Sequence, residues 1–199
     1  MSDKPTYLGL LNAVSLAEGR AHTYLCAWAS RTPSADVRRV LLTVAAREGE
    51  HAASFAKRIN ELGYDVREGD GDELDKAMGI VTSDRSDFEK MKALKLHRLD
   101  TGDKPDIFDN FFRDHTIDIR TGELLGRYIA EERDSARLLR SCYEQLKQAE
   151  RDAPGGAVAD ADDVADAMGT LEAKVDALCR SVDEVRQIVC AQTMPSGTA

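Results

Sequence analysis

The 199-residue sequence has no apolar run that approaches the roughly 18 residues of a membrane-spanning helix. Its first twenty residues also lack the basic-then-apolar pattern and the small-residue cleavage site of a secretory signal. Basic residues are in deficit, 27 against 36 acidic, which gives a net charge of −9. Nucleic acids and anionic membranes both require a basic face, so we expect neither as a partner.

Cysteine, proline and aromatic residues are also scarce. The four cysteines lie far apart and none belongs to a CxxC pair, which argues against a zinc site or a disulfide framework. The expected compartment is therefore the reducing cytoplasm. Five prolines, 6% aromatics and no strand pattern of any length favour an all-α chain.

Apolar residues recur at helical spacing in two neighbouring segments, 8–30 and 35–62. Pro33 interrupts the pattern between them, Ser34 is the expected N-cap of the second helix, and Gly63 is its expected C-terminal stop. Because the connection is short, the two helices are predicted to form an antiparallel hairpin.

The next segment, 64–84, is rich in glycine and aspartate and predicts a long crossover. Further helices are predicted over 72–80, 88–99 and 107–149. The last of these is either continuous or kinked near Thr121-Gly122, and its apolar stripe includes His115, interpreted as a packed core histidine. Residues 1–150 are thus predicted to form a four-helix bundle with one long crossover.

Beyond the bundle, the glycine- and alanine-rich segment 151–160 is predicted to be a flexible linker, and 193–199 a disordered tail. Segment 161–192 has apolar residues that alternate in steps of four and three without a miss, a heptad repeat. The repeat comprises Val164, Met168, Leu171, Val175, Leu178, Val182, Val185 and Val189. It predicts a coiled coil that makes a homodimer or higher homo-oligomer; the alternative is a fifth helix packed on the bundle.

The candidate functional residues are acids that interrupt the apolar stripes. Glu18 occupies a core position in the first helix, and Glu48 and His51 occupy core positions in the second. Glu18 and Glu48 are each about 15 residues from Pro33, so the hairpin brings them to one level. Two carboxylates and an imidazole inside a bundle form a site suited to iron or manganese. The alternative is a solvated ExxH, with Glu18 paired to a nearby arginine.

The sequences around these residues, Leu16-Ala-Glu18-Gly-Arg-Ala-His-Thr-Tyr24 and Arg47-Glu48-Gly-Glu-His51-Ala-Ala-Ser-Phe55, resemble the first two helices of rubrerythrins, in the ferritin-like superfamily. The resemblance covers residues 8–149. It implies a bundle that holds two metal ions between a Glu from each of two helices and an ExxH from each of the other two.

The last predicted bundle helix has no second ExxH. Its apolar stripe favours Glu132 as the inward acid, whereas matching to the motif favours Glu131, with Asp134 at the position of the histidine. The third helix offers no convincing inward acid. A single metal, an unequal pair, a site shared across a dimer and an inactive site therefore all remain open.

The resemblance implies an oxidoreductase of ferroxidase or peroxidase type that reacts iron, or manganese, with oxygen or peroxide. Its metal ligands would be Glu18, Glu48, His51 and Glu132, or Glu131 with Asp134, with no catalytic residue or other cofactor besides. The external electron donor is unknown, because no paired cysteines provide a second iron module. The alternative is a metal-free scaffold whose coiled coil mediates oligomerisation or partner binding.

The heptad repeat generates a test of assembly. Deleting residues 157–199, or replacing Leu171 and Leu178 together by glutamate, should leave a folded bundle of lower oligomeric state, because buried unpaired carboxylates are costly in a coiled-coil seam. Light scattering measures the mass. An unchanged mass after deletion would mean that the segment is a fifth packed helix or a partner-binding arm.

Overall fold

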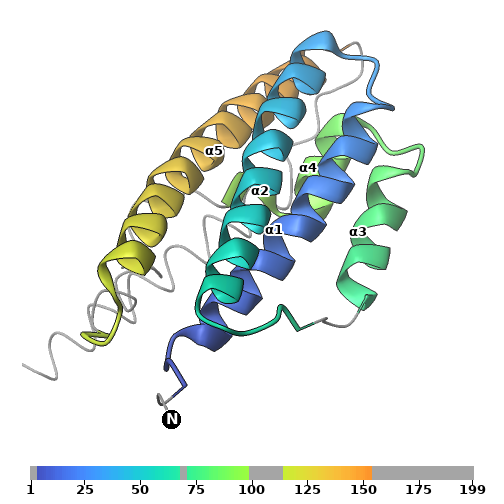
Figure 1. Cartoon of the computed structure of the whole chain (residues 1–199). Helices are drawn as coiled ribbons and strands as arrows, with labels where there is room; N and C mark the ends of the chain where they lie inside the picture. The colour runs from blue at the N-terminus through green and yellow to red at the C-terminus, as the bar shows by residue number, and fades with distance from the viewer. Residues whose placement is uncertain (1–3, 68–70, 99–113, 154–199) are drawn as a thin grey trace, which may run out of the picture. The chain divides into compact units, whose positions relative to one another are not determined.

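The computed structural model describes residues 4–67, 71–98 and 114–153, and every regular element in these ranges is helical. The long helices are α1 (Leu8–Ala29), α2 (Ala35–Glu61) and α5 (Ile119–Asp152). The short elements are α3 (Asp72–Val81), α4 (Asp87–Ala93) and the 3-10 turn η1 (Leu96–Arg98). The all-α prediction is confirmed for the described part of the chain. The three long helices lie side by side, and α3 lies beside α1 (Figure 1), whereas α4 packs against α5 and η1.

The hairpin of α1 and α2 forms as the sequence predicts. The Ser34 hydroxyl accepts a hydrogen bond from the Val37 backbone N–H at 3.3 Å and so caps α2. Gly63 follows the helix with φ of 85°, a left-handed conformation that glycine adopts at least cost. The two helices pack closely enough for the Ser15 hydroxyl to donate to the backbone carbonyl of Ala52 at 3.0 Å.

The predicted long helix over 107–149 begins later than its apolar stripe indicates. Residues 107–113 lie outside the described ranges, and α5 starts only at Ile119. The Asp118 carboxylate accepts from the backbone N–H of Arg120 at 3.0 Å, and this N-terminal cap fixes the start. His115 is exposed rather than packed in the core, and Ile119 is 90% exposed. The helix then continues through Thr121-Gly122 to Asp152 without a break.

The predicted third helix over 88–99 is also shorter than expected. It is α4, which begins with a capping box between Ser86 and Glu89 and ends at Ala93. Lys95 has φ of 56°, so the backbone turns out of the helix before η1. The described residues therefore form three long helices, with short elements in place of a fourth. The short helix predicted over 72–80 is α3, one residue longer.

The apolar core is divided along the long helices into two clusters. One cluster contains Leu25, Trp28, Leu41, Val44, Leu139 and Tyr143; the other contains Leu11, Val14, Phe55, Leu125 and Ile129. Glu18 of α1, Glu48 of α2 and Glu132 of α5 each lie between residues of the two clusters along their own helix. Glu18, for example, lies between Val14 and Leu25. The fold thus contains one buried polar level between two apolar ones.

Only part of the remaining sequence predictions falls within the described residues. No helix in the described ranges combines the length and the apolarity that crossing a bilayer would require. Cys26 and Cys142 are free thiols. α5 extends through Asp152, two residues into the predicted linker 151–160. The coiled coil 161–192 and the tail 193–199 lie outside the described residues.

The contact between α1 and the start of α4 generates a stability test. The Asp87 carboxylate accepts from the indole N–H of fully buried Trp28 at 2.7 Å and from the Thr32 hydroxyl at 2.6 Å. Asp87→Ala should lower the free energy of unfolding by about 1–3 kcal/mol, because both donors lose their partner. Chemical denaturation measures this change, with Asp84→Ala at an exposed neighbouring position as the control. Equal stability of the two variants would contradict this role.

Candidate metal centre

Four of the predicted site residues meet at the polar level of the bundle. Glu18 comes from α1, Glu48 and His51 from α2, and Glu132 from α5. One ligand atom from each of these residues lies within 4.8 Å of the others. Glu18, Glu48 and His51 are 7%, 5% and 3% exposed, and Glu132 is half-buried. These four residues are called the carboxylate cluster below.

Two atoms in the carboxylate cluster, Nδ1 of His51 and Oε1 of Glu132, are buried and face each other as an ion pair at 3.4 Å. Neither atom makes a hydrogen bond. A loose pair of this kind compensates poorly for the burial of its atoms, so a cation that bound both atoms would be favoured. Two ligand atoms on opposite sides of a metal ion, each bound at about 2.1 Å, lie about 4.2 Å apart. The ligand atoms of the carboxylate cluster lie within 4.8 Å of one another, so small side-chain movements would let them bind one ion.

The other ring nitrogen of His51 has a partner. Its Nε2 lies 2.7 Å from Oε2 of Glu131, and the Nε group of Arg127 donates to Oε1 of the same carboxylate at 2.9 Å. Arg127 in turn pairs with Glu50 at the surface. Glu131 therefore lies outside the four-residue group, where it directs Nδ1 of His51 toward the other carboxylates, as outer partners of metal-binding histidines do.

Asp134 lies away from the carboxylate cluster. Its side chain is 43% exposed and pairs with Arg47 at 2.7 Å and with Arg137 at 3.2 Å. Arg47 also donates to the hydroxyl of Ser135 at 3.3 Å, so it does not form the pair with Glu18 considered from the sequence. The apolar stripe therefore located the inward acid of α5 correctly at Glu132, and the motif position of Asp134 is occupied by a surface ion pair.

Sequence reasoning did not identify two contacts that shape the site. The Tyr128 hydroxyl donates to Oε1 of Glu18 at 2.8 Å, and its ring packs edge-on against His51 with centroids 5.0 Å apart. The available signal is that Tyr128 lies one helical turn before Glu132, on the same face. Gly49 is needed because a Cβ there would lie 2.9 Å from Nδ1 of His22, which bonds the Ala45 carbonyl.

The electrostatics of the carboxylate cluster favour bound protons when no cation is present. Burial, together with the nearby Glu48 and Glu132, raises the pKa of Glu18 to about 9. Burial alone would lower the pKa of His51, but the neighbouring carboxylates of Glu132, Glu48 and Glu131 outweigh burial and raise it to about 10. Near neutral pH, Glu18 is therefore a neutral acid and His51 is a cation.

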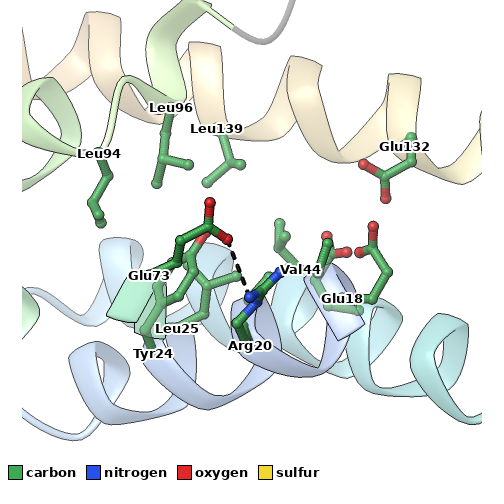
Figure 2. Close-up of a pocket in the computed structure, with 13 residues that line it drawn as sticks. Glu18, Arg20, Tyr24, Leu25, Val44, Glu73, Leu94, Leu96, Glu132 and Leu139 are labelled. Carbon is green, nitrogen blue, oxygen red and sulfur yellow. Dashed lines mark ion pairs between the residues drawn. The ribbon is translucent and has the colours of Figure 1, made fainter. Parts of the chain in front are cut away.

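A cavity of about 330 Å³ adjoins the carboxylate cluster. Glu18 and Glu132 lie at one end of its lining (Figure 2), and Glu48 lines it as well. Leucine and valine side chains from α1, α2, η1 and α5 form much of the rest. The ion pair of Arg20 and Glu73, at 3.1 Å, lies in the same lining. The carboxylates therefore face a space that a small molecule can enter.

Comparisons of the chain with protein-family models, with curated proteins and with solved structures found no match. The chemistry of this site therefore has to be inferred from its own residues.

The raised pKa values predict how the stability of the metal-free protein depends on pH. Glu18 titrates ordinarily near 4.5 and His51 near 6.5, but in the folded protein both hold their protons to about pH 9 or beyond. Between pH 6.5 and 9 the folded state thus binds more protons than the unfolded chain, and stability falls as pH rises. Each of the two protons contributes about 1.4 kcal/mol per pH unit where the unfolded group has lost it, so we expect a decrease of up to about 2–3 kcal/mol per pH unit.

Urea denaturation of the metal-free protein at a series of pH values measures this slope. Glu18→Gln is the matched control, because glutamine keeps the shape of the side chain but does not titrate. The variant should show a shallower slope over the same pH range. A stability that stays level or increases between pH 6.5 and 9 would contradict the proton assignment.

Proposed function

We propose that this chain is a ferritin-like non-haem metal protein that holds iron, or manganese, in the carboxylate cluster and reacts it with oxygen or peroxide. The observation that carries the proposal is the convergence of four ligand atoms within 4.8 Å of one another, among which Nδ1 of His51 and Oε1 of Glu132 face each other at 3.4 Å without a hydrogen bond. Three carboxylates with one imidazole form an oxygen-rich donor set that suits iron and manganese.

The arrangement of the four ligands supports one ion rather than two. The position three residues after Glu132, where a second ExxH would place its histidine, is Ser135, and Arg47 donates to its hydroxyl. In the described part of the chain, the carboxylate cluster is the one group of such ligands. Glu18, Glu48, Glu132 and His51 would then be the ligands of a single ion.

The chain's own residues would prepare the ligands and manage protons. Glu131 accepts a hydrogen bond from Nε2–H of His51 and leaves Nδ1 free to bind a metal. Tyr128 donates to one oxygen of Glu18 and leaves the other oxygen for the ion. Because Glu18 and His51 hold protons in the metal-free state, both must lose them on binding, and affinity should fall as pH falls.

When bound, the metal would supply electrons for the reduction of oxygen or peroxide, and the three carboxylates would stabilise its higher oxidation state. The cavity beside Glu18, Glu48 and Glu132 would admit the oxidant. The apolar clusters on both sides of the carboxylate cluster would limit the access of water.

Replacement of Glu48 and His51 together, by glutamine and leucine, should abolish metal binding. Two of the four ligands are lost, while removal of a buried charged group can leave stability unchanged or increased. The metal content of protein loaded with Fe(II) or Mn(II) is measured by plasma emission, and we expect about one ion per wild-type chain from the single set of four ligands. Asp134→Asn is the control, because Asp134 lies outside the carboxylate cluster and should not be required.

Oxidation of the bound Fe(II) by oxygen or peroxide, followed by absorbance, tests the reaction itself. Wild-type protein and Asp134→Asn should oxidise iron faster than buffer does, and the Glu48/His51 double variant should not. Wild-type protein with well under one metal ion per chain would refute the proposal and favour the metal-free scaffold. Full metal content in the double variant would show that other residues bind the ion.

A further inference from the structure

The cavity beside the carboxylate cluster is larger than oxygen or peroxide requires. Its volume of about 330 Å³ corresponds to roughly ten water molecules at about 30 Å³ each. It lies at the lower end of the size range of small-molecule binding sites, about 300–1,000 Å³. Because oxygen and hydrogen peroxide have only two heavy atoms each, the oxidant proposed above does not account for this space.

The walls of the cavity are mainly hydrocarbon. Apolar side chains come from four different parts of the fold: Leu25 of α1, Val44 of α2, Leu94 and Leu96 around η1, and Leu139 of α5. In Figure 2, Leu94, Leu96 and Leu139 lie across the cavity from Tyr24 and Leu25. Polar groups placed against such walls lose water without gaining a partner, so the walls favour an apolar body.

The charges that line the cavity argue against an anionic occupant. Glu18, Glu48 and Glu132 lie at one end, and a divalent ion bound there would not fully neutralise three carboxylates. Arg20 is the one cationic side chain among the described residues of the lining, and it already pairs with Glu73 at 3.1 Å. The proposed divalent ion would offset most of this negative charge, so an ammonium group would gain little attraction there to compensate for the hydration it loses against the hydrocarbon walls.

From the volume, the walls and the charges, we infer that the cavity binds an uncharged, mainly apolar organic molecule, with one end beside Glu18, Glu48 and Glu132. This deepens the proposed function, on which it rests for the metal at that end, because it names the class of organic molecule that binds beside the metal site. Binding in the cavity depends on its own lining and can be measured with or without metal.

Three probes with the same six-carbon body and different charge test the occupant: 1-hexanol, hexanoate and hexylammonium. Each is titrated into the full-length protein, metal-free and Mn(II)-loaded, by calorimetry or ligand-observed NMR at neutral pH. We expect 1-hexanol to bind, and the two charged probes to bind at least about tenfold more weakly. Equal binding of the three probes, or no binding of 1-hexanol, would overturn the inference.

Ala21→Leu tests the location of the bound probe. Ala21 lines the cavity from α1, one turn after Glu18, and a larger side chain there would occupy part of the space without replacing a ligand. It should weaken 1-hexanol binding by at least about tenfold. Ala53→Leu is the matched control, because Ala53 lies at an exposed position of α2 that does not line the cavity.

The metal content of the same samples separates the two proposals. If metal binds but Ala21→Leu leaves 1-hexanol binding unchanged, the inference about the cavity is overturned and the proposed function stands. If 1-hexanol binds and Ala21→Leu weakens this binding, but the wild-type protein takes up no metal, the proposed function is refuted. The inference that the cavity binds an uncharged, mainly apolar molecule would then still hold.

Discussion

The burial of three carboxyl groups in one small volume is the constraint on which the rest of this structure depends. Glu18, Glu48 and Glu132 cannot all be ionised away from water unless positive charge or protons accompany them. The metal-free protein meets this requirement with protons on Glu18 and His51, whose pKa values burial and their neighbours raise to about 9 and about 10. A cation would replace these protons, so metal affinity, stability and pH dependence are linked through the same four side chains.

The register of the α1–α2 hairpin brings the first three of these residues together. The turn at Pro33 and the cap at Ser34 set this register, and the hydrogen bond from Ser15 to the carbonyl of Ala52 is consistent with it. Gly49 permits close approach of the helices, because a side chain there would collide with His22. One local turn therefore determines a contact between residues 30 positions apart in the chain.

The parts of the site that follow from helical periodicity could be predicted, and the parts set by individual caps could not. The positions of Glu18, Glu48, His51 and Glu132 follow from the apolar stripes, since each occupies a place that a core residue would take. The stripe wrongly extended the last helix through His115, because periodicity does not reveal that Asp118 caps the backbone at that point. Likewise, nothing in the pattern around Lys95 indicates its left-handed conformation, which ends the third bundle helix early.

The shortness of that element has a consequence at the site. A long third helix would continue alongside α1 and α5, whereas here α4 stops at Ala93, and Leu94 and Leu96 follow it into the lining of the cavity. Among the described residues, the segment after α4 therefore contributes apolar side chains to the lining, whereas the carboxylates come from the three long helices. The proposed metal ion would be held by α1, α2 and α5, and the proposed organic molecule would be bounded in part by Leu94 and Leu96.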